Sequence, residues 1–80
     1  MDWHVYILRC GDGTLYTGIA RDLEKRVAVH NSGKGAKYTA RRLPVKLTYS
    51  EEAENRSAAS KREYAIKQLS RAEKLALIAS

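Results

Sequence analysis

Two strand-forming segments separated by a glycine-rich turn constrain the fold of this chain more than any other feature. Trp3 to Cys10 and Thr14 to Ile19 are rich in apolar and β-forming residues, and Gly11-Asp12-Gly13 lies between them. Two such segments joined by a short turn of this kind are typical of a β-hairpin. We therefore predict a β-hairpin at the start of the chain.

The segment after the hairpin predicts a helix followed by a loop. Asp22 can cap a helix whose positions Leu23, Val27 and His30 recur at helical spacing, and Asn31-Ser32-Gly33 supplies the stop. From residue 33 to residue 43 there is no clear period, and glycines alternate with basic residues. This pattern predicts an exposed, partly flexible loop.

A third strand and a second long helix are expected next. Val45 to Glu51 alternates apolar and polar residues at a period of two, as in a half-buried strand. Asn55 or Ser57 can cap a helix that runs to about Leu69. One side of this helix carries the apolar residues Ala59, Ile66 and Leu69.

The final segment predicts a short terminal helix and completes the expected fold. Ser70-Arg71-Ala72-Glu73 matches the capping-box pattern, so we predict a helix from Arg71 to about Ile78, with Leu75 and Ile78 packed against the body. The predicted order is β-β-α-β-α-α in a single domain of residues 1–80. This is an α/β (α+β) fold in which helices flank a small three-stranded antiparallel or mixed sheet.

Length, cysteine content and hydropathy exclude several classes of protein. Eighty residues make one domain, which excludes a two-domain enzyme. The single cysteine, Cys10, excludes an internal disulfide and supplies no metal cluster. The longest apolar run, Leu75 to Ala79, is far shorter than the roughly 20 residues that cross a bilayer, and the first residues lack a signal-peptide pattern. We expect a cytoplasmic protein with no membrane partner.

Basic residues are concentrated in the middle of the chain. The formal net charge is +6, from 15 Lys and Arg against 9 Asp and Glu. Seven of the basic residues and no acidic residue lie from Lys25 to Lys46. Such focusing favours a phosphate-bearing partner, and Gly33 and Gly35 would let backbone amides approach a phosphate. Lysines that only keep a small protein soluble are the alternative explanation.

Five polar residues stand out because they occupy otherwise core-like elements. They are Tyr6 and Tyr16 on the hairpin, Arg26 and His30 on one face of the first helix, and Glu63 at the edge of the apolar stripe of a later helix. A carboxylate at such an edge is costly without a partner, so we expect a cation beside Glu63. Each residue also has an ordinary explanation, as an amphipathic strand residue, a helix-terminal cation or an ion-pair partner.

The spacing of these five residues resembles the GIY-YIG nuclease superfamily. His4-Val5-Tyr6 is followed by Tyr16-Thr17-Gly18, then by Arg26, His30 and Glu63, so the match covers essentially the whole chain. The chain is most similar to small stand-alone bacterial members and more distantly to the amino-terminal nuclease domain of UvrC-type excision-repair subunits. It departs from the family pattern in having a histidine for the first glycine of GIY and a threonine for the isoleucine of YIG.

The resemblance implies a metal-dependent endonuclease that hydrolyses DNA phosphodiester bonds, linked to DNA repair or processing. In such an enzyme Glu63 would hold one Mg²⁺ or Mn²⁺, and Arg26 would grip the non-bridging phosphate oxygens. Tyr6 is the expected general base and Tyr16 would orient the water or the phosphate, although the two could exchange roles. His30 would relay a proton or touch a phosphate. A free phenol has a pKa of about 10. A tyrosine that acts as a base at pH 7 therefore needs its phenolate stabilised by about 4 kcal/mol.

The basic segment supplies the expected nucleic-acid contacts, which are Lys34, Lys37, Thr39, Arg41 and Arg42. Two other functions fit the same sequence: a non-catalytic nucleic-acid-binding module that uses the basic surface between Lys25 and Lys46, and a protein-interaction domain recruited to a repair complex. RNA as the substrate and a protein partner that selects the substrate are both compatible with the sequence.

Overall fold

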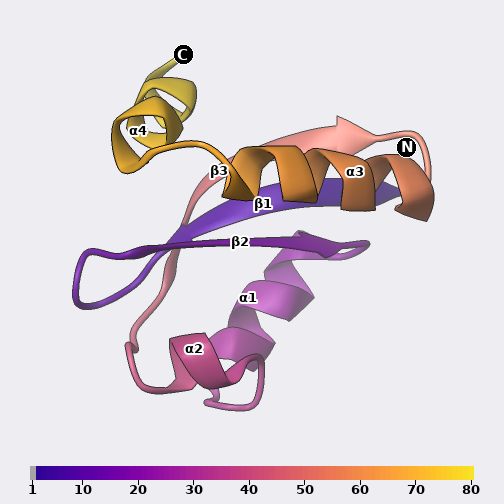
Figure 1. Cartoon of the computed structure of the whole chain (residues 1–80). Coiled ribbons are helices and arrows are strands. Elements are labelled where there is room, and N and C mark those ends of the chain that lie inside the picture. Colours follow the sequence, from indigo (N-terminus) through magenta and orange to yellow (C-terminus); the bar gives the residue numbers. More distant parts are fainter. Residues whose placement is uncertain (1) are drawn as a thin grey trace.

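The computed structural model describes residues 2–80 and contains one three-stranded sheet (Figure 1). The strands lie in the order β2-β1-β3, and β1 pairs antiparallel with both neighbours. Their bounds are β1 (Trp3–Arg9), β2 (Leu15–Ala20) and β3 (Lys46–Ala53). The predicted antiparallel sheet is confirmed, and β1 occupies its centre.

Helices cover both faces of this sheet (Figure 1). One side carries α1 (Leu23–Asn31) and α2 (Lys37–Ala40), and the other side carries α3 (Arg56–Lys67) and α4 (Arg71–Ala79). The observed order is therefore β-β-α-α-β-α-α, with one short helix more than the sequence predicts. No helix within residues 2–80 is long and apolar enough to cross a membrane.

The predicted hairpin forms with a register that matters for the site. Tyr6 of β1 lies directly opposite Gly18 of β2. His4, which departs from the family pattern, pairs with Ala20 and Glu52, and the register shift of β1 against β3 lies further along the strand, between Ile7 and Leu8. In the connecting turn, Asp12 Oδ1 accepts hydrogen bonds from the backbone N–H and the hydroxyl of Thr14, at 3.1 and 2.6 Å.

Alternate residues of β1 supply two separate cores. Val5 and Ile7 face α3 and pack in a cluster with Ala59 and Ile66. Tyr6 and Leu8 face α1 and pack in a second cluster. The other members of this cluster are the buried residues Cys10, Ala20 and Val45 and the half-buried Leu23 and Val27. This alternation follows from the two-residue period of a strand, and it leaves Tyr6 on the α1 side.

Local capping signals set the helix starts as predicted. Asp22 accepts a hydrogen bond from the backbone N–H of Lys25 at 3.1 Å, and Asn55 caps α3 in the same way through Ala58 at 2.8 Å. Ser70 and Glu73 form the reciprocal capping box of α4. These side chains satisfy N–H groups that a helix start leaves without intrahelical partners.

The prediction that Leu75 packs against the body is wrong. Leu75 is 38% exposed, whereas Leu77 and Ile78 contact the α3-side cluster. In α4 the half-buried positions are Lys74, Leu77 and Ile78, which share one helix face. Leu75 follows Lys74 by one residue, so it points about 100° away from this face.

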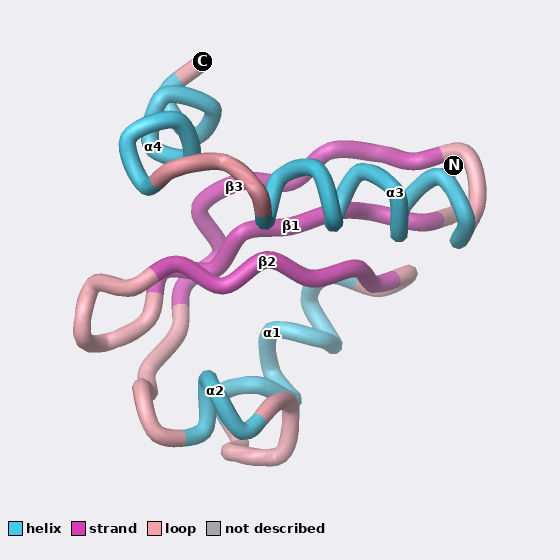
Figure 2. The backbone as a smooth tube through the Cα atoms, in the orientation of Figure 1, coloured by secondary structure: helices cyan, strands magenta, loops and turns pink. Residues whose placement is uncertain are grey.

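The predicted exposed loop from residue 33 to residue 43 is also wrong in part. It contains α2 (Figure 2). Thr39 within α2 is completely buried. The amide of Asn31 bonds both backbone groups of Val45, at 2.7 and 3.1 Å, and so fixes the two ends of this segment to each other. A four-residue helix with one buried polar residue has no apolar period from which to predict it.

Candidate active site

The Tyr6 side chain depends on the glycine opposite it. A Cβ atom on Gly18 would lie 2.5 Å from Tyr6 Oη and 2.7 Å from Tyr6 Cζ. Because no side chain is present at residue 18, the phenol ring lies across β2. This role of the glycine in Tyr16-Thr17-Gly18 was not predicted from the sequence, although the motif was recognised.

A chain of buried hydrogen bonds runs from the Tyr6 hydroxyl to the backbone of the basic segment. Tyr6 Oη lies 2.9 Å from His30 Nε2, and His30 Nδ1 lies 2.8 Å from Thr39 Oγ1. The Thr39 hydroxyl donates to the Ala36 carbonyl at 3.1 Å. Since this uses its only hydrogen, we assign the imidazole proton to Nδ1, which donates to Thr39. His30 Nε2 then accepts from the Tyr6 hydroxyl.

Gly35 allows the backbone of the basic segment to lie directly against His30. A Cβ atom on Gly35 would overlap the imidazole ring of His30. The sequence suggested that this glycine lets backbone amides approach a phosphate. The structure shows a further role, because the missing side chain makes room for His30.

Tyr16 is held against His30 and a second tyrosine. Its ring meets the His30 ring edge-on with centroids 5.3 Å apart, and it stacks on Tyr38 at 5.9 Å. The Arg42 guanidinium lies 3.9 Å from the Tyr38 ring centroid. Tyr38 was not predicted as a site residue, because its contact with Tyr16 depends on the fold of residues 33–40.

Arg26 lies one helical turn before His30, and its charge affects the pKa values of both Tyr6 and His30. Burial raises the pKa of Tyr6 above its usual value; the Arg26 guanidinium opposes this shift, and Tyr16 and Glu63 reinforce it. Burial lowers the pKa of His30, and Arg26 lowers it further. Both rings are therefore neutral near pH 7, with the shared proton on Tyr6.

Glu63 lies in the opposite layer and acts on Tyr6 through its charge. It lies on α3, whereas Arg26 and His30 lie on α1 across the sheet (Figure 1). Its carboxylate is 3.2 Å from Lys67 Nζ, and its side chain is 23% exposed. The expected cation beside Glu63 is thus present, and the carboxylate acts on the pKa of Tyr6.

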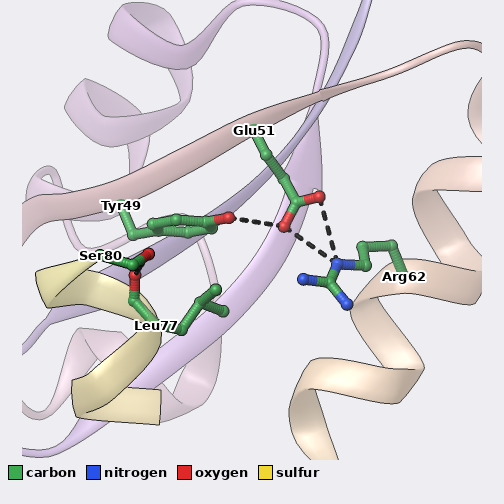
Figure 3. Close-up of polar contacts among 5 residues, drawn as sticks. All are labelled: Tyr49, Glu51, Arg62, Leu77 and Ser80. Atoms are coloured by element: carbon green, nitrogen blue, oxygen red, sulfur yellow. Dashed lines mark hydrogen bonds and ion pairs between the residues drawn. The ribbon is translucent and has the colours of Figure 1, made fainter.

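A polar network next to Glu63 fixes α3 against β3, as Figure 3 shows. The Tyr49 hydroxyl donates to Glu51 Oε1 at 2.8 Å, and Arg62 Nε lies 3.0 and 3.1 Å from the two Glu51 oxygens. The Tyr49 ring also packs in one cluster with Leu77 of α4. Because Arg62 immediately precedes Glu63, this network sets the position of the Glu63 backbone.

The basic segment presents only part of the predicted nucleic-acid contacts. Lys34, Lys37 and Arg41 are exposed and line two shallow depressions of about 200 and 540 Å³. The predicted contact of Thr39 with nucleic acid is wrong, because Thr39 is buried and bonded to His30. Arg42 turns inward, where its Nε lies 3.1 Å from Asp12 Oδ2.

Glu63 fits the single-carboxylate metal site that the resemblance implies. Residues 2–80 contain no group of three or more His, Cys, Asp or Glu side chains placed to hold a metal. Mg²⁺ commonly takes one or two carboxylates and fills its other positions with water and substrate phosphate. The partner of Glu63 is a surface lysine, and such an exposed ion pair is weak. The carboxylate is therefore available to a cation that arrives with the substrate.

The fold and this site define a nuclease-family domain. The family model described as the GIY-YIG catalytic domain matches residues 2–76. The chain therefore belongs to the GIY-YIG family, as its motif spacing indicated.

Its relatives of nearly equal length carry the name UPF0213 protein. One from Halobacterium salinarum is 57% identical over 74 residues, which are 92% of this chain and 96% of the relative. One from Staphylococcus saprophyticus is 57% identical over 79 residues, with 98% and 96% covered. The solution NMR structure of a UPF0213 protein from Bacillus halodurans aligns with a TM-score of 0.62 at 43% identity, covering 99% of this chain and 84% of that one. The small α+β fold is thus shared with these relatives.

Proposed function

We propose that the protein is a metal-dependent endonuclease that hydrolyses DNA phosphodiester bonds. One observation carries this proposal: the Tyr6 hydroxyl is bonded to a neutral His30, and Arg26, Tyr16 and Glu63 all act on its pKa. A base, a fixed cation for the phosphate and a metal-binding carboxylate are the groups that phosphodiester hydrolysis requires.

Tyr6 and His30 act together as the general base. The Tyr6 oxygen takes a proton from the attacking water while the Tyr6 proton passes to His30 Nε2. The water oxygen bonds to phosphorus as the bond to the leaving oxygen breaks, and the leaving oxygen takes a proton from solvent water. Burial raises the pKa of Tyr6, so an isolated phenolate is disfavoured. The coupled transfer avoids that phenolate. Thr39 holds the Nδ1 proton and keeps Nε2 ready to accept.

The remaining residues bind and orient the phosphate. Arg26 holds non-bridging oxygens through its planar, permanently charged guanidinium. Tyr16, fixed by His30 and Tyr38, orients the water or the phosphate. Glu63 would hold Mg²⁺ or Mn²⁺, which supplies Lewis-acid stabilisation of charge on the scissile phosphate.

DNA is the substrate that the surface charge supports best. Exposed Lys34, Lys37 and Arg41 lie in a segment without acidic residues and can track a phosphate backbone. Such contacts position a protein on DNA but do not recognise its sequence. We therefore propose an enzyme that selects DNA structure and serves repair or processing. A free, buried Cys10 agrees with action in the reducing cytoplasm.

The test is a nicking assay on supercoiled and branched DNA with Mg²⁺, Mn²⁺ or EDTA. Wild type is compared with Arg26→Ala, Glu63→Ala and, as a matched surface control, Arg71→Ala on α4. We expect metal-dependent nicking that is lost in the first two variants and retained in the control. Equal traces of nicking in all four proteins would identify a contaminant and favour a non-catalytic nucleic-acid-binding module.

A further inference from the structure

A cavity of about 390 Å³ adjoins the proposed active site at the end of β2. It is lined by Trp3 of β1, by residues 19–22 and by Lys25, Arg26 and Val29 of α1. Since Arg26 lines this cavity, whatever binds there lies next to the scissile phosphate.

The lining combines an apolar wall with an excess of positive charge. Trp3, Ile19, Ala20 and Val29 supply the apolar surface, and Arg21, Lys25 and Arg26 supply three cations. The only acidic residue among the lining is Asp22, whose carboxylate accepts the capping hydrogen bond of α1 at 3.1 Å. An aromatic face beside cations matches a nucleotide, which has a flat base and an anionic phosphate.

Trp3 is covered by arginine side chains as well as by core residues. It packs at the margin of the α3-side cluster and is only partly buried. The guanidinium groups of Arg21 and Arg56 lie 5.9 and 5.8 Å from its ring centroid, close to the outer limit of about 6 Å for cation–π contact. The Arg21 side chain is 64% exposed. A base can therefore displace a guanidinium from the ring without opening the core.

We propose that this cavity binds one unpaired DNA nucleotide beside the scissile phosphate, with its base against Trp3 and its phosphates on Lys25 and Arg26. The proposal rests on the proposed function, because it takes Arg26 as the ligand of the scissile phosphate. A base inside a duplex is paired and stacked, so it cannot reach Trp3 without being extruded, which costs free energy. Strand ends, flaps and junctions already offer unpaired bases. The cavity therefore selects DNA that has an unpaired nucleotide at the cleavage point.

Trp3 is the only tryptophan in the chain, so tryptophan fluorescence reports on the surroundings of this one cavity residue. The emission is titrated in EDTA with a short oligo-dT strand, with an abasic strand of the same length and with a fully paired duplex. The abasic strand has the same phosphate charge but no bases. We expect quenching by oligo-dT and little change with the other two. Equal quenching by the abasic strand, or none by oligo-dT at saturation, overturns the proposal.

Affinity measurements on two variants separate stacking from packing. Trp3→Leu removes the aromatic face, whereas Trp3→Phe keeps it. Loss of base stacking weakens single-strand binding by about 5- to 150-fold, so we expect that loss for oligo-dT with Trp3→Leu and a much smaller loss with Trp3→Phe. Affinity for the abasic strand is expected to stay the same. Equal oligo-dT affinity in wild type and both variants contradicts the proposal.

The two proposals fail in different ways. Quenching and stacking are measured in EDTA, so they test the cavity even if wild type cuts no DNA. Base-dependent quenching without metal-dependent nicking would retain the nucleotide site and reject the endonuclease. Nicking without base-dependent quenching would do the reverse. Circular dichroism confirms that each variant is folded, and the wild-type titration decides the question if either variant is not.

Discussion

The two faces of the sheet are packed differently, although neighbouring residues of the same strand supply both. On the α3 side, Val5 and Ile7 of β1 pack in an apolar cluster with Ile66. On the α1 side, Tyr6 packs in a core that borders the buried polar residues His30 and Thr39. The first cluster needs only matching shapes, whereas the second also needs every polar atom to have a partner.

This difference separates residues that hold the fold from residues that we propose perform chemistry. A buried polar group that loses its partner costs about 1–3 kcal/mol, so a polar core is a poor way to obtain stability. Tyr6, His30 and Thr39 meet this requirement through a continuous chain of hydrogen bonds from Tyr6 to Ala36. Departures from simple core packing are expected at functional sites. The polar core lies where the five motif residues predict catalysis.

The largest expected contrast is between Tyr6 and its neighbour Ile7. Tyr6→Phe removes the proposed base, and loss of general-base catalysis costs about 10²- to 10⁴-fold in rate. Ile7→Val removes one methyl group from the opposite core and should cost about 0.5–1.5 kcal/mol of stability without changing the rate per folded molecule. Nicking rates and urea unfolding of both variants check this expectation.

Each variant has an outcome that would contradict the comparison. If Tyr6→Phe cuts DNA at the wild-type rate, the hydroxyl is not the base and Tyr16 becomes the candidate. If Ile7→Val slows nicking as much as Tyr6→Phe, the rate depends on the packing of both faces of the sheet and not on the Tyr6 hydroxyl in particular. A normal unfolding transition for Tyr6→Phe shows that its loss of rate is not a loss of fold.

Elements with local signals could be predicted from the sequence. The hairpin follows from two β-forming segments and a glycine-rich turn, and the helix starts follow from Asp22, Asn55 and the Ser70 capping box. Residues 37–40 could not be assigned in this way. Their helix is four residues long and begins without a side-chain cap, so only tertiary contacts hold it.

The candidate site was predictable to a similar extent. Motif spacing predicted that Tyr16, Arg26, His30 and Glu63 would lie near Tyr6. In the structure His30 is hydrogen-bonded to the Tyr6 hydroxyl, and the other three act on the pKa of Tyr6.

Motif spacing did not identify Gly18 or Gly35, whose contacts with Tyr6 and His30 require the folded chain. Motif spacing also did not place Thr39, which was expected to contact nucleic acid because it lies in the basic segment. Its burial follows from a hydrogen bond to His30, nine residues earlier.

A smaller effect is expected from Thr39, which positions His30 without contacting the reacting atoms. Thr39→Val keeps the shape but leaves His30 Nδ1 without its acceptor, which should cost about 1–3 kcal/mol of stability. The nicking rate should fall because the imidazole loses its fixed tautomer. Thr39→Ser retains the hydroxyl and is expected to restore most of the rate.

The readout for Thr39 is the pH–rate profile together with urea unfolding. A purely structural role predicts that Val and Ser variants of equal stability cut DNA equally well and show the same acid limb. A positioning role predicts a shifted acid limb in Thr39→Val alone. Wild-type kinetics in the valine variant would remove Thr39 from the proposed proton path.

The smallest expected effect is the pH dependence of stability that arises from His30. Burial lowers the pKa of His30 in the folded state, so the unfolded chain takes up a proton first as the pH falls below about 6.5. The free energy of unfolding should therefore be independent of His30 above that pH and decrease below it, until the folded imidazole also titrates. Asp12 and Glu73 have lowered pKa values, and their contributions are lost only at more acidic pH. Urea unfolding at about pH 7.5 and about pH 5.5 isolates the histidine, and His30→Gln should reduce the difference. An equal difference in both proteins would mean that the polar face of the sheet does not hold His30 in its neutral form, and the proton path from Tyr6 would then lack its acceptor.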